Sequence, residues 1–197
     1  MVSNDKFYAH FQEWASRNDA GAGTEIAVLN DGSREESGRL GAIGDIWFAV
    51  TREGIDDDVL IIAGDNFFTY SLLDLYSFYE SERADCVVVK READARLLQN
   101  FGVAVLDEGG RVVEFEEKPK NPKSDLAVYA TYIYRRDTLP LIGQYLQEGN
   151  NPDAPGNFPA WLCGRRRLVA FVFDGECFDV GTVESYERVC SLYGGRS

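Results

Sequence analysis

The sequence contains little of what many catalytic and structural sites require. It has one histidine and four cysteines in 197 residues. The single histidine, His10, argues against Ser-His-Asp and Cys-His catalysis and is interpreted as a structural residue of a helix. The cysteines form no C-x-x-C pair, so neither a zinc site nor a disulfide framework is indicated. We expect the cysteines to be buried and to behave as small apolar residues. They are Cys86, Cys163, Cys177 and Cys190.

Basic blocks and long apolar runs are also missing. The chain has 33 acidic and 20 basic residues, a net charge of −13 and a pI near 4.5. Binding to nucleic acid or to an anionic membrane depends on Lys and Arg, so the sequence predicts neither partner. Apolar stretches such as residues 59–63 fall far short of the roughly 20 residues that span a bilayer. The start resembles no signal peptide, and the sequence therefore predicts a cytoplasmic protein.

The hydrophobic content and periodicity of the sequence predict one α/β domain over residues 1–197. Hydrophobic residues make up 45% of the chain, enough to bury a sizeable core. Helical and strand periods alternate in the front half. Residues 59–63 are apolar on both faces, which is typical of a central parallel strand covered by helices on both sides. The elements expected there are a helix ending near Asn18, a strand at 25–30, a helix at 40–50, a helix capped by Ser71 and a strand at 86–90.

The pattern changes after about residue 100. Residues 101–107 and 111–118 flank a turn and predict an antiparallel hairpin inserted into a largely parallel sheet. The last elements expected are a strand at 127–134, a helix between Asp137 and Gly149, a strand at 168–173 and a helix from Thr182.

Two strand ends carry aspartates that could bind a metal. Asp65 and Asn66 follow the strand at 59–63, and ligands of open α/β sheets bind outside the carboxyl ends of strands. An acidic side chain there can meet Mg²⁺ together with substrate phosphates. Asp179 lies at another strand end, before a helix. The alternative is that Asp65 and Asn66 are turn residues and that Asp179 and Thr182 only cap a helix.

A third candidate closes the hairpin. Glu117 can accept hydrogen bonds from hydroxyl groups while Lys118 faces a phosphate, which is what a sugar phosphate requires. Adjacent residues of a regular strand face opposite ways, so both can serve one ligand only if the strand breaks there, as Pro119 suggests. The alternative is two exposed charges on a hairpin.

Three further segments invite simpler interpretations. The basic run at residues 165–167 is interpreted as a solvated loop, with an anion site as the alternative. Residues 56–58 are consecutive aspartates that suggest the D-x-D motif of a metal-dependent glycosyltransferase, although they precede a strand instead of following it. Residues 21–24 contain two glycines but lack the strand-to-helix context of a phosphate loop.

Three stretches together, and in this order, resemble the sugar-1-phosphate nucleotidyltransferase family, in particular its glucose-1-phosphate thymidylyltransferases. They are VLIIAGDNFF (59–68), FGVAVLDEGGRVVEFEEKPKNPKSDLA (101–127) and CFDVGTVESY (177–186). The resemblance implies a Rossmann-like three-layer fold with a mainly parallel central sheet. It also implies an enzyme that makes an NDP-sugar and pyrophosphate from an NTP, with dTTP or UTP expected, and a sugar 1-phosphate.

The resemblance also assigns roles to single residues. Asp65 and Asp179 correspond to Mg²⁺ ligands, and Lys118 to the group that binds the sugar phosphate; these three would be catalytic. Glu117 would bind sugar hydroxyls. The other substrate-binding positions that the resemblance implies are Asn66, Gly102 and Tyr132.

The chain departs from the family at its front. The family's first strand, Gly-rich phosphate loop and following Lys-Pro segment are absent, so we interpret the domain as N-terminally incomplete. The missing phosphate loop favours one alternative, a non-catalytic subunit that binds a sugar phosphate or nucleotide sugar. Residues 56–58 suggest the other, a metal-dependent glycosyltransferase. Missing front strands would leave a sheet edge uncovered, which predicts a homo-oligomer.

Overall fold

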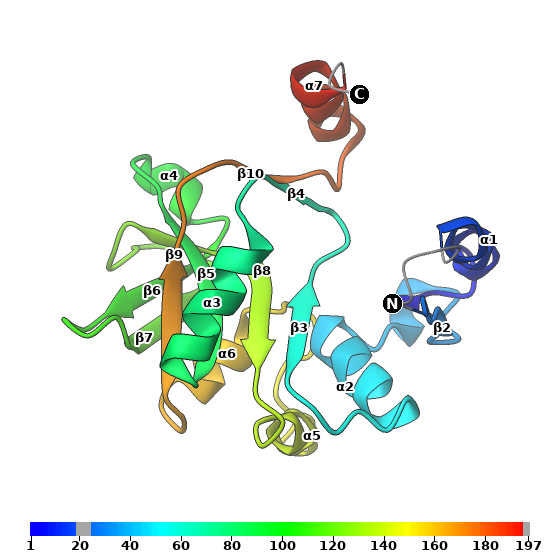
Figure 1. Cartoon of the computed structure of the whole chain (residues 1–197), viewed down its shortest axis with the longest axis horizontal. Helices are drawn as coiled ribbons and strands as arrows, with labels where there is room; N and C mark the ends of the chain where they lie inside the picture. The colour runs from blue at the N-terminus through cyan, green and yellow to red at the C-terminus, as the bar shows by residue number, and fades with distance from the viewer. Residues whose placement is uncertain (19–24, 195–197) are drawn as a thin grey trace. The chain divides into compact units, whose positions relative to one another are not determined.

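Strands and helices alternate along the chain in the computed structural model, which describes residues 1–18 and 25–194 (Figure 1). The glycine-containing segment at residues 21–24 lies outside the described residues. By its internal contacts the chain forms two units, Met1–Asp57 with Leu139–Phe158 and Asp58–Thr138 with Pro159–Ser197. Helix α6 (Asn157–Leu162) contains one of the boundaries.

The first unit is mainly helical. Its strands β1 and β2 pair in parallel, with Val2 opposite Leu29. Helices α2 and α5 contact each other, and Tyr145 of α5 meets the ring of Phe158 edge-on at a centroid distance of 5.7 Å. The elements are β1 (Val2–Ser3), α1 (Tyr8–Asn18), β2 (Leu29–Asn30), the 3₁₀ helix η1 (Glu36–Gly38), α2 (Ala42–Arg52) and α5 (Leu139–Gln147).

The second unit is built on a mixed sheet. The strand order is β7-β6-β8-β5-β9, and β3 also pairs with β8. The strands are β3 (Val59–Ile62), β4 (Asn66–Phe68), β5 (Asp85–Arg91), β6 (Gly102–Leu106), β7 (Val112–Glu117), β8 (Leu126–Tyr134), β9 (Leu168–Val172) and β10 (Cys177–Asp179). The helices are α3 (Leu72–Glu82), α4 (Ala95–Leu98) and α7 (Val183–Tyr193).

Strand directions explain how the sheet is mixed. β5 and β9 pair in parallel, whereas β8 runs antiparallel to β3, to β5 and to β6. β3, β5 and β9 therefore point the same way, and β6 and β7 form the antiparallel hairpin that the sequence predicts. The predicted α/β fold class is confirmed.

Helix α3 covers one face of this sheet (Figure 1). Ser71 caps the helix as predicted, because its hydroxyl accepts a hydrogen bond from the Asp74 N–H at 3.2 Å. Leu75 and Tyr79 of α3 are buried in one cluster with Cys86 and Val169 of the sheet. Burial of this apolar face stabilises both elements, since it removes their apolar area from water.

Two expectations about burial were wrong. Strand β3 is not covered on both faces: within the described residues it pairs only with β8, and Leu60 and Ile62 are 45% and 37% exposed. An apolar run shows that a strand can be buried, but its neighbours decide whether it is. The cysteines also differ in environment, because Cys86 is buried whereas Cys190 is exposed.

Candidate functional site

Asp65 and Asp179 lie side by side although they are far apart in the sequence. Strands β4 and β10 pair antiparallel, and Asp179 is opposite Asn66. The backbone N–H of Val180 donates to the Asp65 carbonyl oxygen at 2.7 Å, which closes the ribbon next to both side chains. Both aspartates are exposed. The structure thus brings together three of the residues that the sequence singles out.

Gly181 marks where the two carboxylates converge. A β-carbon on Gly181 would lie 2.9 Å from Asp179 Oδ1 and 3.8 Å from Asp65 Oδ2. The Gly181 N–H already donates to Asp179 Oδ1 at 2.8 Å. The absence of a side chain at this position therefore leaves room between two carboxylates.

The end of the β6–β7 hairpin forms a second cluster. Gly102 is opposite Glu117 in the register. A β-carbon on Gly102 would come within 2.8 Å of the Phe115 ring and 3.0 Å of Glu117 Oε2. Only glycine leaves this side of the Glu117 carboxylate open without displacing the Phe115 ring.

Lys118 breaks the strand, as the Pro119 signal predicts. Strand β7 ends at Glu117, and Lys118 has φ of 49°, a left-handed conformation that is uncommon outside glycine. The Lys118 N–H donates to the Phe101 carbonyl oxygen at 3.0 Å, which holds this bend, and Pro119 is buried. The alternation of a regular strand therefore ends before Lys118, and its side chain is exposed beside the half-buried Glu117.

Tyr132 is a buried residue of strand β8 that interacts electrostatically with Glu117 of this cluster. Its side chain is 3% exposed, and its ring stacks on Tyr134 with the planes 5° apart. Burial raises the pKa of Tyr132, and the negative charge of Glu117 raises it further. Burial also raises the pKa of Glu117, while the positive charge of Lys118 opposes that shift. The Glu117 carboxyl group thus interacts electrostatically with a buried phenol, Tyr132, and with an exposed cation, Lys118.

Strand β8 brings the two clusters to the same edge. Gly102 is opposite Val128, and the Ala63 N–H donates to the Ala130 carbonyl oxygen at 2.9 Å. These two β8 positions are two residues apart, about 7 Å along a strand. Asp65 follows Ala63 closely, so the aspartate pair and the Glu117–Lys118 pair are neighbours along β8.

The donor chemistry of the aspartate pair suits a hard divalent cation. Mg²⁺ is usually bound through one or two carboxylates, with water and substrate phosphates completing its coordination. The described residues contain no group of three or more His, Cys, Asp or Glu side chains arranged to bind a metal. Asp65 and Asp179 are therefore suited to a metal shared with a phosphate ligand and not to an all-protein cage.

Asp58, the last of the three aspartates that precede β3, has a structural role. Asp58 accepts hydrogen bonds from the Tyr79 hydroxyl and from the Arg136 N–H, the latter at 2.7 Å. These contacts tie the start of β3 to α3 and to the end of β8. One of the three aspartates behind the glycosyltransferase hypothesis is thus engaged in the fold.

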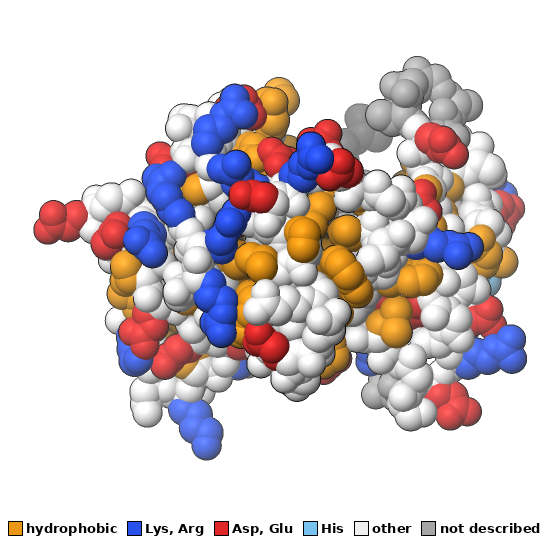
Figure 2. All heavy atoms as spheres, turned by 90° about the horizontal axis from the view of Figure 1, so that it is seen from below, with side chains coloured by type: hydrophobic (Ala, Val, Ile, Leu, Met, Phe, Trp, Pro, Cys, Tyr) orange, Lys and Arg blue, Asp and Glu red, His pale blue; other side chains and the backbone are white. Residues whose placement is uncertain are grey.

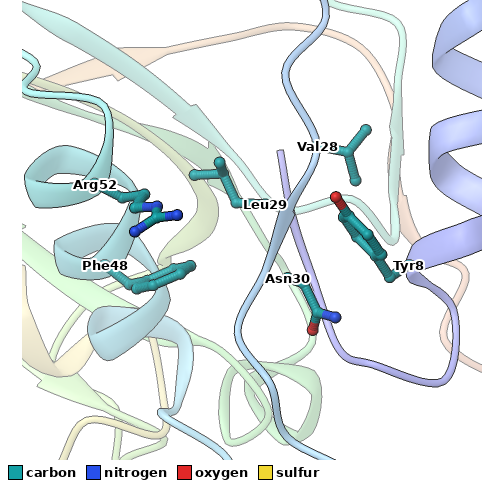
Figure 3. Close-up of a pocket in the computed structure, with 6 residues that line it drawn as sticks. All are labelled: Tyr8, Val28, Leu29, Asn30, Phe48 and Arg52. Carbon is teal, nitrogen blue, oxygen red and sulfur yellow. The ribbon is translucent and has the colours of Figure 1, made fainter.

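A hollow in the first unit was missed by sequence reasoning (Figure 3). Its volume is about 340 Å³, and it contains none of the predicted site residues. Figure 3 shows the Phe48 ring and the Arg52 side chain on α2 and the Tyr8 ring on the other side of the Val28–Asn30 segment. Its other lining residues are Val28, Leu29 and Asn30. No motif joins these residues in the sequence, which is why only the folded chain reveals the hollow.

No helix in the described part of the chain is both long and apolar enough to cross a membrane.

The chain matches the model of a known family and several known proteins. The family, described as nucleotidyl transferase, matches residues 2–194. A glucose-1-phosphate adenylyltransferase of Thermomicrobium roseum is 34% identical over 145 residues, which are 71% of this chain and 33% of that protein. A similar enzyme of Desulfitobacterium hafniense is 33% identical over 65% of this chain. The chain thus spans about a third of the length of these curated relatives.

Solved structures share the fold. A UDP-glucose pyrophosphorylase in complex with UDP-glucose superposes with a TM-score of 0.74 at 19% identity, over 96% of this chain and 74% of the other. A UTP-bound UGPase of Acinetobacter baumannii gives a TM-score of 0.69 at 18% identity, over 99% and 71%. At this identity the likeness shows a common fold.

Proposed function

Because this chain belongs to the nucleotidyl transferase family, we propose that it transfers a nucleotidyl group from an NTP to a sugar 1-phosphate. The observation that carries the proposal is the convergence of Asp65 and Asp179 at Gly181. The Glu117–Lys118 pair lies beside them, because the strands that carry both pairs meet neighbouring positions of β8. This arrangement combines carboxylates for a metal with a carboxylate and a cation for a sugar phosphate.

In the proposed reaction an oxygen of the sugar 1-phosphate forms a bond to the α-phosphorus of the NTP. The bond from that phosphorus to the bridging oxygen breaks, and pyrophosphate leaves with the electron pair. Several anions must approach one another, so positioning and charge neutralisation supply most of the catalysis. When bound, Mg²⁺ would neutralise phosphate charge, and Asp65 and Asp179 would be the residues that hold it.

The hairpin residues would bind and orient the sugar phosphate. Lys118 would place its ammonium group against the phosphate, and ionised Glu117 would accept hydrogen bonds from sugar hydroxyls. Gly102 would let the sugar approach the backbone beside Glu117, and Tyr132 would contribute to the substrate-binding site. Asn66, opposite Asp179, would contact the substrate near the metal.

The substrates proposed are glucose 1-phosphate and dTTP or UTP. Glucose 1-phosphate is supported by the named relatives, one of which is a glucose-1-phosphate adenylyltransferase and another a UDP-glucose pyrophosphorylase with bound UDP-glucose. UTP is supported by the bound UGPase structure, whereas the curated relatives named above are adenylyltransferases. ATP is therefore the necessary comparison in any assay.

The test is pyrophosphate release by the 197-residue chain with Mg²⁺, a panel of NTPs and a panel of sugar 1-phosphates. We expect release with glucose 1-phosphate and one preferred NTP. Asp65→Asn should lower the rate of release about a hundredfold or more, which is the usual effect of losing one electrostatic contact to the transition state. Asp174→Asn is the matched control, because Asp174 is also exposed and lies on a loop of the same unit.

Unchanged turnover of Asp65→Asn would overturn the site assignment. Saturable binding of glucose 1-phosphate without release from any NTP would overturn catalysis by this chain and support the binding-subunit alternative.

A further inference from the structure

Five arginines line one hollow in the second unit, at the end of the sheet opposite to Asp65. We call it the arginine hollow; its volume is about 360 Å³. A quarter of the chain's 20 lysines and arginines gather here although the whole chain carries a net charge of −13. Its lining residues are Arg83, Ala84, Asp85, Arg135, Arg165, Arg166 and Arg167.

Strand directions explain why these residues meet. β5 and β9 are parallel, and Asp85 at the start of β5 is opposite Leu168 at the start of β9. β8 is antiparallel to β5 and ends at this same edge. Arg83 precedes β5, Arg167 precedes β9, and Arg135 follows β8. Figure 2 views the molecule from the side at which β9 begins in Figure 1, and Lys and Arg side chains form a band across that face.

Neighbouring carboxylates hold most of these guanidinium groups in place. Arg167 pairs with Glu82 and also donates to its carbonyl oxygen at 2.7 Å. Arg83 pairs with Glu80 at 2.7 Å. Each guanidinium has five N–H donors, so these contacts fix the groups and leave other donors available.

Asp137 joins two of the segments. Its carboxylate lies 2.5 Å from Arg166 Nη2 and 3.3 Å from Arg135 Nε. Asp85 is buried and accepts from the Arg135 N–H and the Thr138 hydroxyl, at 2.9 and 2.8 Å. Hydrogen bonds therefore fix the buried Asp85 of the hollow, and the Asp137 carboxylate links the guanidinium groups of Arg135 and Arg166 by ion pairs.

Arg165 differs from the other four arginines. Its guanidinium lies 4.0 Å from the centre of the Trp161 ring, and it donates to the Trp161 carbonyl oxygen at 2.9 Å. Within the described part of the chain no carboxylate forms an ion pair with it. A cation held by an aromatic ring and a carbonyl group keeps its full charge for an external anion.

The backbone at Arg83 supports a role for its side chain. Arg83 caps the carboxyl end of α3 with φ of 49°. Glycine or asparagine adopts this left-handed conformation at little cost, whereas other residues are strained in it. The strained position nevertheless carries a side chain that lines the hollow.

We propose that the arginine hollow binds a small anion that carries two linked phosphate groups. Guanidinium groups donate two parallel N–H bonds to phosphate oxygens, and here they come from three segments around one space. The volume falls within the range of small-molecule sites, about 300–1,000 Å³. The proposal is independent of the proposed function, and it selects the anion-site alternative for residues 165–167.

Inorganic pyrophosphate is the probe. It is titrated by calorimetry into the 197-residue chain at constant ionic strength, with EDTA present so that no divalent metal contributes. We expect saturable binding at one site, and Arg83→Gln with Arg165→Gln should weaken it about a hundredfold, or tenfold for each charged hydrogen bond. Arg165→Gln alone should weaken it about tenfold.

A matched double variant separates a site from general charge. Arg96→Gln with Arg188→Gln removes one ion-paired arginine and one that lies over an aromatic ring, in the same unit but outside the hollow. It should bind pyrophosphate as the unmodified chain does.

Three results would overturn the proposal. They are no saturable binding by the unmodified chain, equal losses in the two double variants, and binding that survives in Arg83→Gln with Arg165→Gln but is lost in Lys118→Gln. The last result would place the anion at the opposite end of the sheet.

Discussion

Carboxylates at the two ends of the sheet of the second unit have opposite environments. At the carboxyl end of β3, Asp65 and Asp179 are exposed, and among the described residues Asp179 Oδ1 accepts a hydrogen bond only from the nearby Gly181 N–H. At the amino end of β5, Asp85 is 1% exposed, and each of its oxygens accepts a hydrogen bond. Carboxylates whose oxygens are fully used stabilise the fold, whereas those with open oxygens remain available to a ligand.

Cationic residues at the two ends of the sheet can be compared in the same way. Lys118 and Arg83 are the non-glycine residues with positive φ in the described chain, both at 49°, and they lie in the two clusters that we propose as anion sites. Such a conformation costs about 1–2 kcal/mol in residues other than glycine. Strain is therefore found where each cluster presents a cation.

The largest effect is expected at the open carboxylates. Asp179→Asn should lower turnover by about 10²–10³-fold, because one charge that would bind the metal is lost. Its free energy of unfolding should stay within about 0.5 kcal/mol of the unmodified chain, as for other exposed substitutions. Pyrophosphate release and urea unfolding measure the two quantities, with Asp174→Asn as the control. Loss of stability in parallel with activity would break the distinction between open and bonded carboxylates.

The bonded carboxylate should behave in the opposite way. Asp85→Ala leaves the Arg135 N–H and the Thr138 hydroxyl without their acceptor, at a cost of about 3 kcal/mol in the free energy of unfolding. Urea unfolding checks this value against Asp174→Ala, which should change it little. A mild effect in Asp85→Ala would mean that these donors find water or other acceptors.

Gly102→Ala tests the packing of the proposed sugar site. The added β-carbon would lie 2.8 Å from the Phe115 ring, so the ring must move, at a cost of about 2 kcal/mol. The matched control is Gly164→Ala, because nothing lies within 4 Å of the position of its β-carbon. Equal unfolding midpoints for the two variants would show that the Phe115 ring can move aside without a measurable cost in stability.

The smallest effect is expected at Asp45 of α2, in the first unit. Its Oδ1 is buried without a hydrogen-bond partner among the described residues. Burial, aided by Asp31, raises the pKa of Asp45 from 3.8 to about 6. The folded chain therefore holds this proton more tightly than the unfolded chain does, and stability falls as pH rises from about 4 to above 6.

Asp45→Asn removes that penalty. It should stabilise the chain by about 1 kcal/mol at pH 7.5, a value reduced because the half-buried group is partly screened by solvent. Below pH 4 the gain should disappear. Urea unfolding at both pH values measures it, and an equal gain at both would mean that the charge of Asp45 is not its cause.

Local signals predicted the elements well. The 101–118 hairpin, the cap at Ser71 and the strand break after Glu117 all follow from neighbouring residues, and the structure contains each of them. Expectations that needed distant neighbours did worse. The first helix ends at Asn18 as expected, yet the sequence does not indicate what covers it, and its Phe11 and Trp14 are exposed.

By itself the sequence determined the order of strands and helices, the excess of acid and the identity of the candidate residues, because periodicity, caps and turns act over a few positions. Only the tertiary structure decided which charges meet. Asp65 joins Asp179 through the β4–β10 register, and Arg83 joins Arg135 and Arg167 because three strands share one edge. Strand register depends on contacts between distant segments, and no local pattern specifies it.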